Sequence, residues 1–187
     1  MVEHLRRPRS WRAGAGDGPL HGVVAAAGIS GRFGLGTDEL TAADFADVYR
    51  VNVIGSFLFV QQALPALRRG RDARVVLMGS DSGFVASQGM LPYIASKGAV
   101  RQLTAALSVE LAPDGIWVNS VCPSVVDTPM ARDDLGDDAF VGADFPVLSS
   151  HDVAHHVLNL LSPANRGING TSVVCDFGYM ARSGFPA

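Results

Sequence analysis

The chain has 187 residues, of which 48% are hydrophobic and 18% are charged, and its formal net charge at pH 7 is −3. This length predicts one domain with a substantial core, and the lack of a basic excess argues against a nucleic-acid partner. No stretch approaches the roughly 18 apolar residues of a membrane span, and no apolar segment follows the early arginines as a secretory signal requires. We therefore expect a cytoplasmic protein without membrane or nucleic-acid partners.

Residues 1–18 are rich in Arg, Gly and Pro and show no sustained periodicity. We expect this segment to be poorly ordered and to precede a domain at residues 19–187. Buried strands are predicted where short apolar runs stand between turn residues. The runs are residues 20–28, 74–80, 116–123 and 170–178.

Helices are predicted between these strands, where apolar residues recur at intervals of three and four. Thr41 and Asp44 provide helix-start chemistry for a helix that reaches Leu67; the others span residues 92–112 and 149–161. Strands that are apolar throughout and alternate with helices are typical of a parallel sheet with helices on both faces. The predicted fold class is therefore α/β, a doubly wound parallel sheet.

Ligands of such sheets bind beyond the carboxyl ends of the strands. Gly28, Ser80 and Pro123 close the first three predicted strands, so we expect them at one rim. Tyr93 and Lys97 lie four residues apart and share a helix face. An ammonium beside a phenol favours the phenolate, which predicts a lowered Tyr93 pKa and a role as general acid or base. The Ser80 hydroxyl could bind the same carbonyl oxygen.

With these residues in place, the chain resembles the short-chain dehydrogenase/reductase family over about residues 19–182. The resemblance rests on motifs that are weak singly but specific in their order and spacing. They are AAAG (25–28), Asn52 within VNVIGSF, Ser80 thirteen residues before Tyr93, YIASK (93–97), PSVVDTPM (123–130) and VCDFG (174–178).

The resemblance implies an NAD- or NADP-dependent oxidoreductase that interconverts a ketone and a secondary alcohol. It implies Tyr93 as the general acid or base, supported by Ser80, by Lys97, which also grips the nicotinamide ribose, and by Asn52, which holds a water in a proton relay. No catalytic metal is implied. The cofactor-binding residues implied by the motifs are Ala26, Gly28, Tyr93, Lys97, Pro123, Ser124, Val126 and Thr128.

The phosphate-binding pattern of the family, Thr-Gly-x-x-x-Gly-x-Gly between a strand and a helix, is not found in these 187 residues. Glycine runs at 14–22 and 28–36 lack the required strand and helix on either side. The chain is therefore expected to correspond to strands four to seven of the family, with its first strand as an apolar edge. Ala25, Ala26 and Ser124 also replace family residues near the cofactor, so weakened cofactor binding is predicted.

Three functions stay open on the sequence. The first is the oxidoreductase, acting on a small carbonyl or alcohol substrate. The second is a catalytically impaired fragment that acts as a dimerisation or interaction module, and a mis-started gene model is a further alternative. The resemblance implies a homo-oligomer built by helices 44–67 and 93–112. The third is a nucleoside-sugar epimerase, because such relatives also use Tyr-x-x-x-Lys.

Other polar and sulfur-bearing residues are interpreted structurally. The acid-rich run 131–144 is interpreted as a solvated, mobile substrate lid. His151 and His155 stand on one helix face without a third metal ligand nearby, so a solvated surface is favoured. Asn119 and Ser120 are expected to make structural hydrogen bonds. Two cysteines in separate apolar runs, Cys122 and Cys175, are expected to be buried, reduced thiols.

Overall fold

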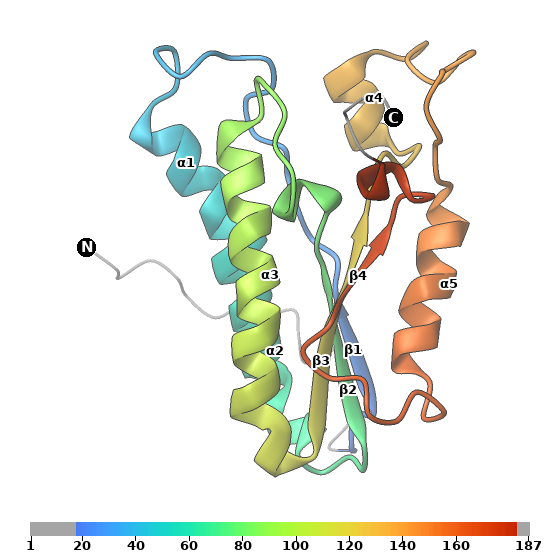
Figure 1. Cartoon of the computed structure of the whole chain (residues 1–187). Helices are drawn as coiled ribbons and strands as arrows, with labels where there is room; N and C mark the ends of the chain where they lie inside the picture. The colour runs from blue at the N-terminus through green and yellow to red at the C-terminus, as the bar shows by residue number, and fades with distance from the viewer. Residues whose placement is uncertain (1–17, 183–187) are drawn as a thin grey trace.

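The computed structural model describes residues 18–182 and contains a four-stranded parallel sheet between two layers of helices (Figure 1). The strands lie in the order β1-β2-β3-β4. They are β1 (Gly22–Ala25), β2 (Ala73–Met78), β3 (Ile116–Pro123) and β4 (Ser172–Cys175), and each neighbouring pair is parallel. The predicted fold class, a partial Rossmann-like sheet, is confirmed. The prediction of poor order for residues 1–18 falls, except for Gly18, outside the described residues.

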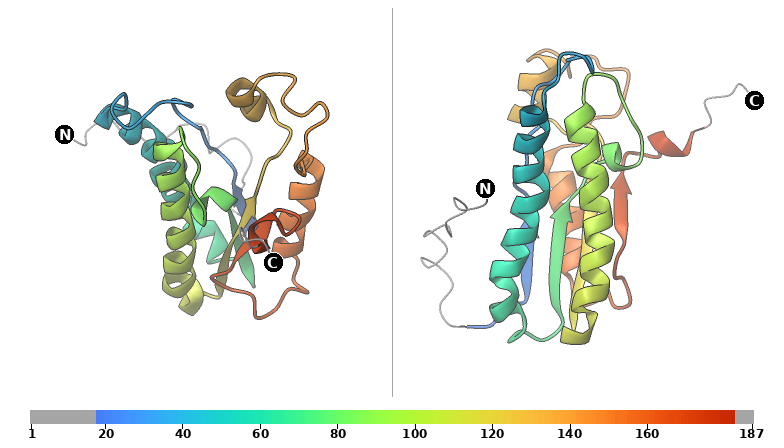
Figure 2. Two further views of the ribbon diagram at one scale, coloured as in Figure 1. Left: turned by 45° about the horizontal axis from the view of Figure 1, so that its top comes forward. Right: turned by 90° about the vertical axis from the view of Figure 1, so that its left-hand side faces the viewer.

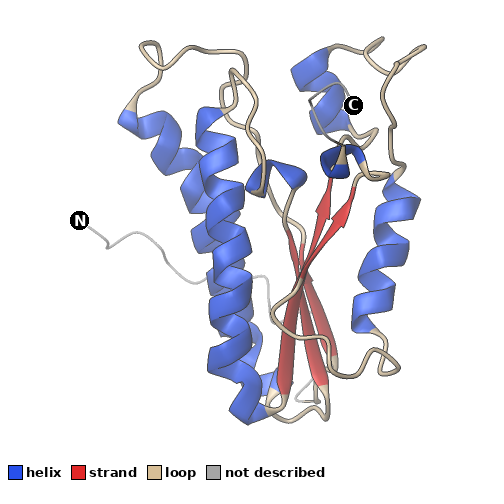
Figure 3. Ribbon diagram, viewed as in Figure 1, coloured by secondary structure: helices blue, strands red, loops and turns tan. Residues whose placement is uncertain are grey.

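Helices cover both faces of this sheet (Figures 2 and 3). On one face, α1 (Ala42–Tyr49), the π-helical segment η2 (Arg50–Gly55) and α2 (Ser56–Leu67) follow one another beside α3 (Leu91–Leu111). On the other face lies α5 (Ser150–Leu161), and α4 (Pro129–Leu135) stands above the carboxyl ends of the strands. Three short 3₁₀ turns complete the fold: η3 (Asp81–Gly83), η4 (Ala112–Asp114) and η5 (Tyr179–Ala181).

Two of the predicted helix starts are capping boxes. The Thr41 hydroxyl accepts a hydrogen bond from the Asp44 amide, and the Asp44 carboxylate accepts one from the Thr41 amide at 2.8 Å. Ser149 and Asp152 repeat the arrangement at the start of α5. Each box satisfies donors that a helix start would otherwise leave unpaired, so the sequence itself fixes where these two helices begin.

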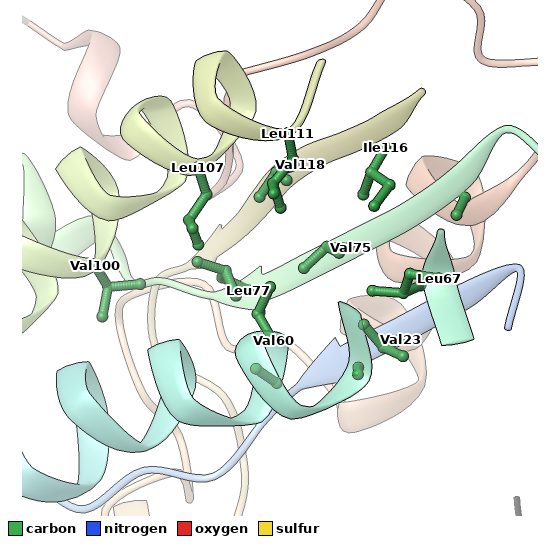
Figure 4. Close-up of a cluster of buried hydrophobic side chains, with 13 residues drawn as sticks. Val23, Val60, Leu67, Val75, Leu77, Val100, Leu107, Leu111, Ile116 and Val118 are labelled. Carbon is green, nitrogen blue, oxygen red and sulfur yellow. The ribbon is translucent and has the colours of Figure 1, made fainter. Parts of the chain in front are cut away.

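The hydrophobic core contains more buried residues on the face of the sheet that carries α2 and α3. Val75 and Leu77 of β2 point to that face, and Val76 points to α5, because successive strand side chains alternate. The cluster against α2 and α3 holds 13 buried residues, and the cluster against α5 holds seven. Residues labelled in the larger cluster (Figure 4) are Val23, Val60, Leu67, Val75, Leu77, Val100, Leu107, Leu111, Ile116 and Val118.

The predicted element boundaries need three corrections. β2 ends at Met78, so Ser80 does not close the strand but caps η3, where its Oγ accepts from the Ser82 amide at 3.1 Å. The first part of the run 131–144, interpreted as a mobile lid, is helical: α4 begins at Pro129, because Thr128 caps the helix and Pro129 suits its first turn. The helix predicted to reach Leu67 contains the π-helical turn η2, which apolar periodicity cannot reveal.

The structural roles predicted for other residues are confirmed. Asn119 Nδ2 donates to the Ile168 carbonyl at 3.0 Å, and the Ser120 hydroxyl pairs with the Ser172 hydroxyl at 2.8 Å. Both cysteines are buried and free of disulfides. Within residues 18–182, β1 pairs only with β2 and forms one edge of the sheet, and none of the helices is long and apolar enough to cross a membrane.

Candidate active site

A cavity of about 800 Å³ lies at the carboxyl ends of β1, β2 and β3, bounded by α3, α4 and α5. This is the rim at which the sequence places the site. The structure brings all the predicted site residues except Asn52 to the lining of this cavity. They are Ala26, Gly28, Ser80, Tyr93, Lys97, Pro123, Ser124, Val126 and Thr128.

Ser80 is held at the rim by the turn that follows β2. Its backbone is extended, its side chain is buried, and its Oγ donates to Asp81 Oδ1 at 3.0 Å. Gly79 precedes it because a Cβ there would overlap the Cys122 sulfur. Gly83 follows because a Cβ there would lie 2.9 Å from the Lys97 carbonyl oxygen. The two glycines therefore let the turn lie against both β3 and α3, which fixes the Ser80 hydroxyl in the cavity wall.

Lys97 extends from α3 beneath the Tyr93 ring toward the end of β2. Its Nζ donates to the Met78 carbonyl at 2.9 Å and lies 5.4 Å from the centre of the Tyr93 ring. Lys97 is only 4% exposed. Burial disfavours the charged ammonium and lowers the Lys97 pKa to about 8. The predicted pair thus lies at one wall of the cavity, with the lysine held by a backbone carbonyl.

The predicted lowering of the Tyr93 pKa is wrong for this structure. Burial of the phenol raises the Tyr93 pKa, and the carboxylates of Asp81 and Asp134 raise it further. A hydrogen bond with Ser80 acts in the opposite direction. Sequence spacing correctly placed Lys97 beside the ring, but it could not show that loss of water around the phenol raises the Tyr93 pKa.

Asn52 acts as a clamp between the loop after β1 and α3. Its Nδ2 donates to the Ile29 carbonyl at 3.0 Å and to Ser96 Oγ at 2.9 Å, while its Oδ1 accepts from the Ile29 amide at 2.9 Å. The Ser56 hydroxyl donates to the Asn52 backbone carbonyl at 2.7 Å. The side chain is 1% exposed and fully engaged, so its direct effect is to position the loop that contains Gly28.

Two acidic residues of the cavity were missed by sequence reasoning. Asp81 follows Ser80 directly and accepts its hydroxyl hydrogen. Asp134 on α4 accepts a hydrogen bond from Ser30 Oγ at 2.9 Å, across 104 positions of sequence. Adjacency to Ser80 could have singled out Asp81. Asp134 had no such signal, because it stands among similar acids in a run interpreted as a lid.

Comparison with known proteins identifies the family of this fold and site. The family model described as enoyl-(acyl carrier protein) reductase matches residues 12–180. A short-chain dehydrogenase of Neurospora crassa, srdC, is 33% identical over 183 residues, covering 86% of this chain and 67% of the relative. The chain belongs to the short-chain dehydrogenase/reductase family. It is therefore a member of a family of oxidoreductases, as the motifs predicted.

Two further similarities bear on function. The mitochondrial borneol dehydrogenase of Lavandula x intermedia is 33% identical over 162 residues, covering 86% of this chain and 62% of the relative. The solved structure of ElxO with NADP bound superposes with a TM-score of 0.78 at 26% identity, covering 87% of this chain and 68% of that one. The chain thus spans about two thirds of the length of these relatives. Because the solved structure of ElxO contains NADP, the comparisons lend no support to the expectation of weakened cofactor binding.

Proposed function

We propose that this chain carries the catalytic groups of an NAD- or NADP-dependent oxidoreductase that interconverts a small ketone and a secondary alcohol. The observation that carries the proposal is the meeting of Ser80, Tyr93 and Lys97 at one wall of the cavity. Relatives named for dehydrogenation, one of them for the alcohol borneol, support the reaction class.

Tyr93 is the proposed proton donor and acceptor. The phenol is protonated at neutral pH and can therefore protonate a developing alkoxide during ketone reduction. Its raised pKa makes it a weaker acid, so a positive charge from Lys97 or the bound cofactor would assist the transfer. In alcohol oxidation the same oxygen would receive the substrate proton, and a charged Lys97 would favour the resulting phenolate. The Ser80 hydroxyl, now donating to Asp81, would turn its hydrogen to the substrate oxygen and hold it beside Tyr93.

The residues present fit the nicotinamide half of the cofactor. Lys97 would offer further ammonium hydrogens to ribose hydroxyls. Thr128 and Ser124, which follow β3, line the same cavity and would contact the nicotinamide. The bound cofactor would supply or accept the hydride. Asn52 would act by positioning the loop that contains Gly28 rather than by holding a relay water with its side chain, because its amide is already hydrogen-bonded to Ile29 and Ser96.

A homo-oligomer through residues 44–67 and 93–112 is proposed as the working assembly. Apolar side chains are exposed on these helices, including Ile54, Phe57 and, at 77% exposure, Val109. Such exposed apolar groups favour association between copies. Light scattering should report a mass above that of one chain, and Phe57→Glu should reduce it. A wild-type mass of a single chain would contradict this proposal.

The decisive experiment replaces Tyr93 with Phe. Turnover of cyclohexanone with NADH or NADPH should fall about a thousandfold, because a positioned general acid contributes roughly 10² to 10⁴ in rate. Tyr49→Phe, on α1 and outside the cavity lining, is the matched control and should keep wild-type activity. Circular dichroism would show that both variants are folded. Retained turnover in Tyr93→Phe would overturn the assignment.

A further inference from the structure

The charge distribution in the cavity is uneven. Its charged lining residues among positions 18–182 are Asp81, Asp134 and Lys97, and neither Arg nor His contributes. Two carboxylates therefore face one ammonium whose pKa is already lowered by burial. The rest of the wall is largely apolar, with Phe33, Met90 and other large side chains.

Asp134 lines this cavity and is held there by a hydrogen bond from the loop after β1. Ser30 Oγ, from the loop after β1, donates to Asp134 Oδ1 at 2.9 Å, and Asp134 is partly buried between that loop and α4. A smaller neighbouring cavity is lined by both Asp134 and the preceding residue, Asp133, which is exposed and does not line the main cavity. The helix thus directs one of two adjacent carboxylates into the main cavity.

No cation of the described chain neutralises Asp134. Arg132 is the basic residue of α4, but its Nε and Nη2 both donate to Asp127 at 2.7 Å. None of the ion pairs within residues 18–182 includes Asp134 or Asp81. The second oxygen of Asp134 accepts no hydrogen bond from this part of the chain. Asp81 differs, since the hydroxyls of Ser80 and Ser82 both donate to it.

We infer that Asp134 is a specificity-determining residue that selects substrates with a positive charge near the reacting carbon and disfavours carboxylates and phosphates. The inference rests on the proposed oxidoreductase function and names its substrate class: apolar ring alcohols or ketones that carry an amine cation. An unneutralised carboxylate in a partly desolvated cavity attracts a cation and repels an anion more strongly than it would in water. Asp134 and Tyr93 line the same cavity, and the Asp134 carboxylate contributes to the raised Tyr93 pKa.

Three alcohols of nearly equal shape test this charge preference. They are 4-hydroxy-N,N-dimethylpiperidinium, 4,4-dimethylcyclohexanol and 4-hydroxycyclohexanecarboxylate, which are cationic, neutral and anionic. Wild type should oxidise them with kcat/KM falling in that order. Asp134→Asn keeps the acceptor for Ser30 but removes the charge, so the ratio of cation to neutral alcohol should fall about tenfold.

Two control variants separate charge from structure. Asp133→Asn makes the same change on the same helix, outside the main cavity, and should leave the ratio unchanged. Ser30→Ala breaks the hydrogen bond to Asp134 but keeps the charge, so it should also retain the preference for the cation. Loss of preference in Ser30→Ala to the level of Asp134→Asn would assign the effect to loop position and overturn the inference.

Binding measured without cofactor separates this inference from the proposed function. Saturation-transfer NMR of the cationic and neutral alcohols should show stronger transfer to the cation in wild type and equal transfer in Asp134→Asn. That result without turnover would contradict the oxidoreductase and leave the charge preference standing. Turnover with an unchanged ratio in Asp134→Asn, or an effect only on cofactor KM, would overturn the preference alone. Equal or undetectable binding of both alcohols would also overturn it.

Discussion

Helices α2 and α3 seal one face of the sheet, whereas α5 covers the other face only in part. The sealed face buries Leu67, Val75 and Val118 with no measurable exposure. On the α5 face, Val24 of β1 and Leu158 of α5 line the open cavity instead of a core. The reactive groups belong to elements of the sealed face, and the space for ligands lies on the open one. A rigid support beside an open cavity holds catalytic groups in place while leaving room for substrate.

Matched leucine truncations would test this difference most strongly. Leu67→Ala on the sealed face should lower the free energy of unfolding by about 3–5 kcal/mol, because the cavity it leaves cannot collapse or fill with water. On α5, Leu160 is 4% exposed and Leu158 is 62% exposed. Leu160→Ala should lower the free energy of unfolding by about 2–3 kcal/mol, and Leu158→Ala by less than about 0.5 kcal/mol. Urea denaturation measures all three. Equal losses at Leu67 and Leu158 would remove the distinction between the faces.

Asn52→Ala would test how firmly the sealed face supports the site. The substitution removes three hydrogen bonds and leaves the Ile29 amide and carbonyl without their partner. We expect a loss of about 2–4 kcal/mol, with faster amide exchange in residues 26–31. Asn165→Ala, whose hydrogen bonds to Asn159 are exposed, is the control and should cost less than about 1 kcal/mol. A similar cost at both positions would show that Asn52 is no special clamp.

Lys97→Met would measure how much the buried Lys97 ammonium, beside the end of β2, lowers the stability of the folded protein. The Lys97 pKa is lowered to about 8 in the folded protein, against an ordinary value of 10.5. Between these values the unfolded chain binds the extra proton, so stability due to Lys97 rises with pH. The free energy of unfolding of wild type, minus that of Lys97→Met, should therefore rise by about 1 kcal/mol per pH unit between pH 8 and 10. Parallel pH curves for the two proteins would refute the burial effect.

The capping boxes of α1 and α5 allow a comparison of the two faces in which the smallest effect is expected. Thr41→Ala and Ser149→Ala should each cost about 1 kcal/mol, since each leaves one helix-start amide without its acceptor. Their local effects should differ, because α5 borders the cavity and has fewer neighbours on its face. Hydrogen exchange should speed up along α5 in Ser149→Ala, and only at the first turn of α1 in Thr41→Ala. Equal spreading of the change in both variants would count against a loosely held α5.

The local sequence carried much of the fold. Apolar runs located all four strands, and the boxes at Thr41 and Ser149 marked helix starts, because these signals act between neighbours in the chain. Boundaries were less accurate. β2 ends two residues before Ser80, since the hydroxyl of Ser80 binds the Ser82 amide and begins a turn. The lid interpretation of residues 131–144 does not anticipate helix α4, because its seven residues show no apolar stripe.

Motif spacing likewise determined which residues meet in the cavity. Ser80, Tyr93 and Lys97 converge because parallel strands end at one rim and residues four apart share a helix face. Only the tertiary structure decided their electrostatics. Burial raises the Tyr93 pKa and lowers that of Lys97, and the carboxylate of Asp134 reaches the site from 41 residues further along the chain than Tyr93. Desolvation and charges brought together by folding depend on every packed neighbour, so no local pattern encodes them.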